Sequence, residues 1–172
     1  MAIDDAQKQQ METGKGFIAA LDQSGGSTPK ALGLYGVGPE DYDGEDAMFT
    51  AMHDMRARII KSRDFTSDKV IGAILFERTM DATIDGKPVA ELLWQDRGGV
   101  PVLKIDNGLQ DTASGVQLMK PMPELDVLLD RAKTAGIFGT KERSVIHEAN
   151  ESGIGAVVAQ QFEVAKKVCK AG

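Results

Sequence analysis

Short apolar runs alternate along this chain with segments in which apolar residues recur every three or four positions. Four runs have the length and continuity of buried strands, and they lie at residues 17–21, 70–76, 100–105 and 137–140. Continuous apolar runs are typical of strands covered on both faces, as in parallel sheets. We therefore predict four parallel strands, the first of them buried on both faces.

The segments between the runs have helical periodicity. Residues 45–61 carry one apolar stripe, made by Met48, Met52, Met55 and Ile59. Three more helical segments follow, at residues 89–95, 123–132 and 144–171, the last of them interrupted near Gly153 and Gly155. Strands that alternate with helices predict right-handed βαβ units around a parallel sheet, hence an α/β fold.

The pattern alone leaves two architectures open. One is a small open α/β domain, and the other is the front half of a (β/α)8 barrel, because a whole barrel takes about 250 residues and this chain has 172. No segment rich in proline, serine or charge divides the sequence. We therefore expect a single domain over residues 1–172.

Composition narrows the class of partner. The formal charge is −6 and no long run of one sign occurs, so nucleic acid is not expected as a partner. The first residues are too polar for a signal peptide and no window suits a membrane span, so we expect a cytoplasmic protein. Cys169 is the single cysteine, and we expect it in the core. His53 and His147 lie in helical patterns without further ligands nearby, so no metal site is expected.

The first apolar run stops on an acid and a small polar loop. Asp22 follows the run, and Ser24, Gly25, Gly26 and Ser27 come next. The carboxyl ends of parallel strands face the ligand crevice of α/β sheets, and hydroxyls with bare backbone N–H groups suit an anion. The alternative is that Asp22 caps the next helix and the glycines only form the turn.

Cations follow the third and fourth runs. Lys104 lies inside the third run with Asp106 two residues later, and Lys141 and Arg143 end the fourth. On an extended backbone Lys141 and Arg143 point the same way, and such a pair can clamp a phosphate. The alternative is a structural ion-pair network of Asp22, Lys104 and Lys141, since a lysine on a buried strand needs a partner.

Several motifs in one order resemble a known family. Residues 14–30, 72–77, 102–108 and 138–143 look like the N-terminal portion of class I, Schiff-base fructose-bisphosphate aldolases of the bacterial branch. The resemblance runs along essentially the whole chain. It implies a (β/α)8 TIM barrel, of which this chain covers about the first four β/α units, and so favours the half barrel over the open domain.

The resemblance also implies an activity and a set of site residues. The family cleaves fructose 1,6-bisphosphate reversibly into dihydroxyacetone phosphate and glyceraldehyde 3-phosphate in glycolysis and gluconeogenesis, with no metal and no cofactor. Asp22 matches the aspartate that positions and ionises groups around the substrate carbonyl, and Lys141 a lysine that assists Schiff-base chemistry. The positions that match the family's contacts to the sugar phosphate are Ser24, Ser27, Lys104 and Arg143, with Lys30 at the mouth of the site.

Other parts of the family's site have no match here. The lysine that forms the Schiff base, a pair of glutamates and a glycine-rich phosphate loop lie in the second half of the family's sequence, beyond Gly172. We therefore expect a truncated N-terminal half that is inactive alone and lacks a C-terminal half. An alternative is a non-catalytic sugar-phosphate-binding half barrel that self-associates, because four strands leave two open edges.

Overall fold

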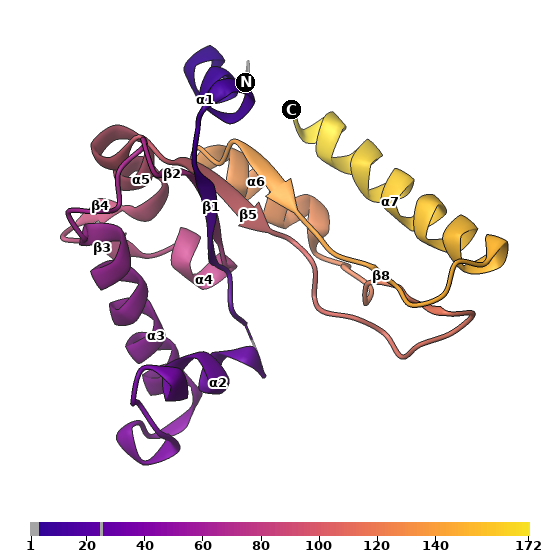
Figure 1. The fold of residues 1–172 in the computed structure, drawn as a ribbon, viewed down its shortest axis with the longest axis horizontal. Coiled ribbons are helices and arrows are strands. Elements are labelled where there is room, and N and C mark those ends of the chain that lie inside the picture. Colours follow the sequence, from indigo (N-terminus) through magenta and orange to yellow (C-terminus); the bar gives the residue numbers. More distant parts are fainter. Residues whose placement is uncertain (1–3, 25) are drawn as a thin grey trace.

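Four parallel strands form the central sheet of the molecule (Figure 1). The computed structural model describes residues 4–24 and 26–172, so Gly25, predicted in the anion-binding loop, lies outside the described residues, as do residues 1–3. The strands are β1 (Phe17–Leu21), β2 (Val70–Leu75), β5 (Val100–Lys104) and β7 (Gly139–Lys141). They lie side by side in chain order, which confirms the four predicted strands and gives a sheet that winds in one direction, as barrels do.

Helices connect the strands, and two short antiparallel strand pairs extend the connections. The helices are α1 (Asp5–Thr13), α2 (Ser27–Leu34), the 3-10 turn η1 (Pro39–Asp41), α3 (Gly44–Lys61), α4 (Glu77–Met80), α5 (Val89–Arg97), α6 (Leu125–Thr134) and α7 (Glu151–Ala171). β3 (Thr83–Ile84) pairs with β4 (Lys87–Pro88) in a hairpin, and β6 (Val116–Gln117) pairs with β8 (Val145–Ile146), which follows it in the chain after α6 and β7. The predicted helices over 45–61, 89–95 and 123–132 correspond to α3, α5 and α6.

One face of the sheet carries the core. Leu21, Leu75 and Leu103 are paired across β1, β2 and β5 and are 5%, 0% and 0% exposed. They belong to two apolar clusters that join the sheet to α3 and α5 on one side and to α6 and α7 on the other. At about 25 cal/mol per Å² of buried apolar surface, this layer supplies the main stabilisation of the fold.

The opposite face of the sheet is covered at the amino end of the strands by α1. A Cβ on Gly72 of β2 would lie 3.5 Å from the Met11 sulfur, in contact with α1, but only 2.9 Å from the Val100 carbonyl oxygen, so a larger residue would force β5 away. Beyond α1, on β1, Ile18 is 41% exposed. We call this the inner face, because it is the face that a barrel encloses.

The prediction that the first strand is buried on both faces is wrong. Phe17 and Ile18 of β1 are exposed, whereas β2 and β5 are buried along nearly their whole length. The reason is position in the sheet: β1 pairs only with β2, so it is an edge strand with a partner on one side. A continuous apolar run therefore does not distinguish a strand at the edge of the sheet from a buried strand inside it.

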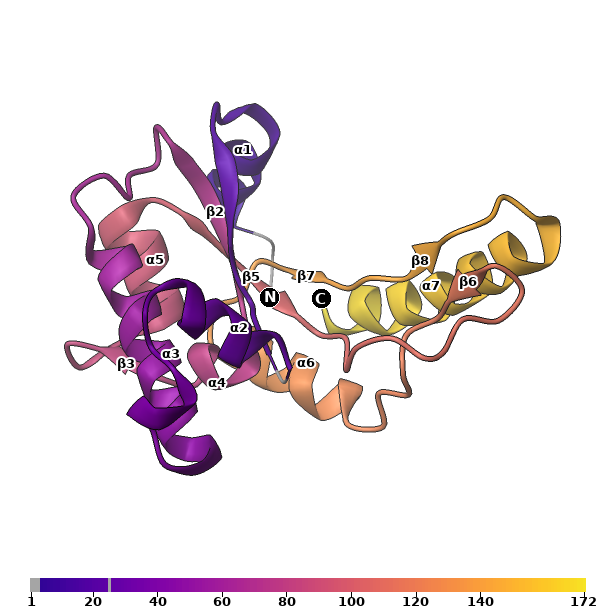
Figure 2. The same ribbon diagram turned by 60° about the horizontal axis from the view of Figure 1, so that its bottom comes forward.

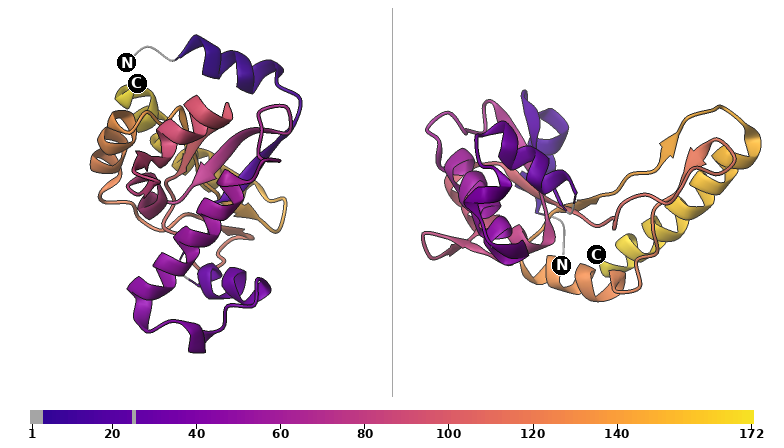
Figure 3. Two further views of the ribbon diagram at one scale, coloured as in Figure 1. Left: turned by 90° about the vertical axis from the view of Figure 1, so that its left-hand side faces the viewer. Right: turned by 90° about the horizontal axis from the view of Figure 1, so that it is seen from below.

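The C-terminal part projects from the sheet as an arm of α7 with the two-stranded sheet of β6 and β8 (Figures 2 and 3). The predicted interruption near Gly153 is absent, because α7 runs unbroken from Glu151. A Cβ on Gly153 would lie 2.3 Å from the Ser114 carbonyl oxygen, so this glycine serves packing against the preceding loop.

Two single-residue predictions about this arm are also wrong. Cys169 is exposed, because it lies on a face of α7 that nothing in the described chain covers. His147 lies in a bend after β8 and not in a helix, whereas His53 is helical as predicted. Within the described part of the chain, no helix is long and apolar enough to cross a membrane.

Candidate active site

The sheet register places three of the predicted site residues in one row. Leu21 pairs with Leu75, Leu75 with Leu103, and Lys104 with Lys141. Asp22, Lys104 and Lys141 therefore lie one step beyond the last apolar row of the outer face. Because side chains alternate along a strand, this row faces inward at the carboxyl ends of the strands.

An ion pair crosses the inner face from the first strand to the fourth. The Lys141 ammonium donates to Asp22 Oδ2 at 3.0 Å, with side-chain exposures of 32% and 13%. Three strand spacings amount to about 14 Å along a flat sheet, too far for these two side chains to span. The contact therefore requires the curvature of a barrel wall.

The third strand holds a second ion pair. Lys104 Nζ lies 3.0 Å from Asp106 Oδ1 and also donates to the Asp106 backbone carbonyl oxygen. The exposures of the two side chains are 12% and 5%. Asp22, Lys104 and Lys141 therefore do not form one ion-pair network. They belong to two separate pairs, each made of one acid and one lysine.

Glu142, which the sequence reasoning did not single out, lies next to both pairs. Burial raises the pKa of the Glu142 carboxyl, the negative charge of Asp106 raises it further, and Lys141 acts in the opposite direction. The inner face thus collects acids and lysines, an arrangement that can donate and accept protons.

The loop after β1 is ordered by its own hydroxyl. Ser27 Oγ accepts from the Ser24 N–H at 3.0 Å and donates to the Ser24 carbonyl oxygen at 2.9 Å. This contact fixes the start of α2, whose N-cap position Gly26 supplies no side-chain cap. Lys30 is exposed one turn into α2. The alternative that Asp22 caps the next helix is not found: α2 has no side-chain cap, and the Asp22 carboxylate accepts from Lys141.

The strand that carries Lys141 does not extend to Arg143. β7 ends at Lys141, and Arg143 lies in the following coil with its side chain exposed. The strand stops there because its pairing with β5 stops at Lys104. The alternation argument therefore places Lys141 on the inner face but does not place Arg143.

Arg56 is a second residue that the sequence reasoning missed. It is 1% exposed and donates to the Gln23 carbonyl oxygen and to Thr79 Oγ1. Burial lowers the pKa of its guanidinium to about 10, and the Asp22 carboxylate counteracts that shift. Met48, Met52, Arg56 and Ile60 follow one another at steps of four, so helical periodicity could have placed this arginine in the core.

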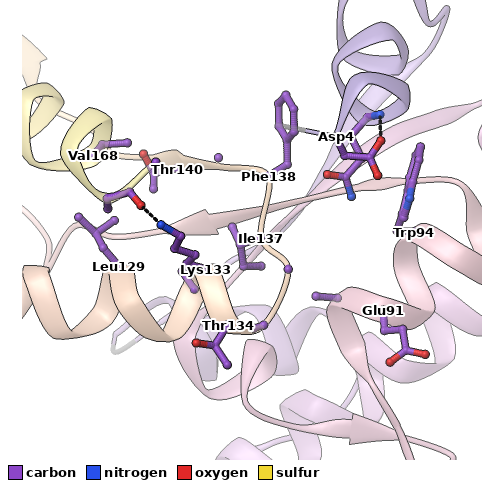
Figure 4. A pocket seen from close by; sticks show the side chains of 18 of the residues that line it. Asp4, Glu91, Trp94, Leu129, Lys133, Thr134, Ile137, Phe138, Thr140 and Val168 are labelled. Carbon is purple, nitrogen blue, oxygen red and sulfur yellow. Dashed lines mark hydrogen bonds between the residues drawn. The ribbon is translucent and has the colours of Figure 1, made fainter. Parts of the chain in front are cut away.

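One cavity of the described chain lies away from this cluster. It has a volume of about 420 Å³ and is lined by residues of α5, α6 and α7 and by residues 136–140 at the amino end of β7. Figure 4 shows Trp94, Lys133 and Phe138 around it. None of the predicted site residues lines this cavity, so it is separate from the inner-face cluster.

Comparison with known proteins gives the relationship. The chain is 53% identical over 174 aligned positions to the class 1 fructose-bisphosphate aldolase of Synechocystis sp.. This chain is a homologue of class I fructose-bisphosphate aldolase. No family model matches it. The alignment covers the whole chain and 58% of that relative, so the chain spans somewhat more than half the length of the curated aldolase.

The solved structures agree on the fold of this aldolase homologue. A co-crystal structure of Plasmodium falciparum fructose-bisphosphate aldolase, in complex with TRAP and a small-molecule inhibitor, superposes with a TM-score of 0.68 at 18% identity. The match covers 95% of this chain and 50% of that one. The chain therefore has the fold of half an aldolase barrel, as its sequence predicts.

Proposed function

We propose that this chain supplies the first half of the active site of a class I aldolase, as one domain. In the complete protein the reaction is the reversible cleavage of fructose 1,6-bisphosphate into dihydroxyacetone phosphate and glyceraldehyde 3-phosphate, in glycolysis and gluconeogenesis. The observation that carries the proposal is the ion pair of Asp22 and Lys141 at 3.0 Å, in a chain 53% identical to an aldolase.

The two partners of that pair have complementary chemistry. The Lys141 ammonium is a proton donor and the Asp22 carboxylate an acceptor, and both are partly shielded from water. Groups held in hydrogen-bond reach of each other can move a proton to and from a carbonyl or carbinolamine oxygen. In the proposal, Asp22 and Lys141 transfer this proton, and a lysine from another segment forms the Schiff base.

The phosphate contacts are assigned to the cations and hydroxyls around the pair. In the proposal Ser24, Ser27 and Lys30 take part on the side of β1, and Lys104 and Arg143 on the side of β5 and β7. Arg143 is exposed at its position after β7, and an exposed arginine can give a phosphate two parallel hydrogen bonds. Lys104 must share its ammonium between Asp106 and a phosphate.

Complementation tests the proposal. This chain, mixed with the downstream half of a related aldolase, is expected to cleave fructose 1,6-bisphosphate, whereas neither half does so alone. The activity is expected to survive EDTA and to be lost when borohydride is added with substrate, because borohydride reduces a Schiff base to a stable amine. Activity that EDTA abolishes would contradict the Schiff-base assignment.

The phosphate assignment has its own test in the complemented enzyme. Arg143→Gln is expected to weaken binding of the bisphosphate by about 1.5–3 kcal/mol, the value of a hydrogen bond to a charged group. Fructose 1-phosphate, with one phosphate fewer, is expected to lose much less. Equal losses on both substrates would remove Arg143 from the phosphate site.

A second candidate function is a sugar-phosphate-binding half barrel that self-associates. It is favoured by the exposed edge strand β1, on which Phe17 and Ile18 are 60% and 41% exposed, because open apolar edges tend to pair. Light scattering at several concentrations tests it. A folded chain that stays monomeric throughout would exclude self-association and leave the first proposal untouched.

A further inference from the structure

Arg56 is the most completely buried charged side chain described in this structure. It lies in the apolar stripe of α3, 1% exposed, between Met52 and Ile60, which are both 0% exposed. Burying a guanidinium among methionines is costly unless its hydrogens find partners. The hydrogen-bond partners of the guanidinium therefore indicate what Arg56 does in the fold.

The guanidinium joins two loops at the carboxyl end of the sheet. Its Nη2 donates to the Gln23 backbone carbonyl oxygen at 2.5 Å, and its Nη1 donates to Thr79 Oγ1 at 2.6 Å. Gln23 directly follows Asp22, and Thr79 lies in α4 after β2. The rigid fork of an arginine can bridge two such separated acceptors, whereas a lysine ammonium carries its three donors on a single nitrogen.

The bridge acts on the residue that faces Lys141. Arg56 donates to the Gln23 carbonyl oxygen, in the residue directly after Asp22. The Gln23 side-chain amide donates in turn to the Ala20 carbonyl oxygen at 2.9 Å. These contacts hold the backbone beside Asp22, whose carboxylate accepts from Lys141. The Asp22 charge in turn favours the charged form of Arg56.

We propose that Arg56 is a positioning residue for the inner-face site, which fixes Asp22 opposite Lys141 through the Gln23 carbonyl. The proposal rests on the proposed function for its catalytic consequence, but its structural content stands on the chain alone. It predicts that loss of the bridge releases the Asp22–Lys141 pair without touching either residue.

The experiment measures the pair directly in this chain. Arg56→Met, Arg56→Lys and Thr79→Val are each labelled with a limiting amine-acylating reagent, and the rate at Lys141 is read by mass spectrometry. Arg58→Met is the matched control, because Arg58 is exposed on the same helix and its loss changes the net charge equally. Circular dichroism and thermal unfolding show which variants are folded.

The Asp22 carboxylate holds the Lys141 ammonium in a hydrogen bond at 3.0 Å, and an acyl donor must displace it to reach the nitrogen. Because such a hydrogen bond contributes about 0.5–1.5 kcal/mol, Arg56→Met is expected to raise the labelling rate of Lys141 about threefold or more, with smaller rises for Arg56→Lys and Thr79→Val and none for Arg58→Met. An unchanged rate at Lys141 in folded Arg56→Met would overturn the proposal. Should Arg56→Met not fold, an unchanged rate in both Arg56→Lys and Thr79→Val would overturn it.

The complemented enzyme adds a second readout. Misplacing a reacting group by about 1 Å can cost up to about a hundredfold in rate, so Arg56→Met is expected to lower kcat at least tenfold with KM little changed, and Arg56→Lys to restore part of it. A purely structural role would lower the folded fraction and leave kcat per folded site unchanged. Absence of cleavage in the unmodified mixture would contradict the proposed function, while the labelling result would still decide the role of Arg56.

Discussion

The two ion pairs of the inner face differ in how they are built. Lys104 and Asp106 are two residues apart and lie on one strand end, where 12% and 5% of their side chains are exposed. Asp22 and Lys141 lie 119 residues apart on the outermost strands and are exposed to 13% and 32%. The local pair is the better buried, and the distant pair depends on the curvature of the sheet.

This difference in burial favours different roles for the two ion pairs, one in stability and one in catalysis. A deeply buried pair that loses one partner leaves an uncompensated charge, which costs more than losing an exposed pair. A partly exposed pair at the crevice keeps one partner accessible to a ligand. We infer that the Lys104–Asp106 pair contributes more to stability and the Asp22–Lys141 pair more to chemistry, and the predictions below test this ranking.

The largest effect is expected for Lys104→Met. The change leaves the Asp106 carboxylate 5% exposed without its cation and is expected to cost about 3 kcal/mol in the free energy of unfolding, measured by urea titration. Lys167→Met is the matched control, since Lys167 pairs with Asp126 at 2.9 Å on the surface, and such pairs contribute less than about 1 kcal/mol. Equal losses in the two variants would contradict the special burial of the inner pair.

A smaller loss of stability is expected for Lys141→Met. Asp22 retains some contact with water, so its unpaired carboxylate is expected to cost about 1–2 kcal/mol in the same titration. In the complemented enzyme this variant is nevertheless expected to lose more kcat than Lys104→Met. If Lys141→Met proved the more destabilising of the two while retaining kcat, the division between a structural and a functional pair would be reversed.

The smallest effect concerns pH and Glu142. Its pKa is raised in the folded chain, so the folded state holds this proton more tightly than the unfolded state does. The resulting stabilisation is fully present below the ordinary glutamate pKa of 4.5 and is lost as the pH rises through the raised value. Glu142→Gln is expected to remove this decline, seen as a flatter plot of unfolding midpoint against pH. Glu148→Gln, an exposed control beyond β8, is expected to leave the decline in place.

Much of this fold could be predicted from the sequence, because hydrophobic period and burial are local properties. The apolar runs gave the strands of the sheet, and the stripe of Met48, Met52 and Met55 gave α3. The position of a strand within the sheet is not local, and for that reason the exposure of β1 was predicted wrongly. The unbroken course of α7 was missed because Gly153 is used for close packing.

The candidate site, too, could be predicted only in part. The row of Asp22, Lys104 and Lys141 could be predicted, since the ends of parallel strands lie at one edge. Which acid pairs with which lysine could not, because it depends on curvature that no local pattern encodes. The direction of the Arg143 side chain stays a prediction, because β7 ends at Lys141. Arg56 was overlooked although its spacing of four from Met52 indicated burial.

The length of chain between Asp22 and Lys141 also bears on the order in which the molecule forms. At about 5–20 residues per second, a ribosome takes about 6–24 s to add the 119 residues that separate them. Asp22 waits through that time without its lysine, while Lys104 and Asp106 emerge together and can pair at once. Closing so long a loop is entropically unfavourable until intervening strands have docked. The crevice is therefore the last part of the sheet to assemble, and a mutation that slows docking of β2 or β5 delays it without altering any residue of the site.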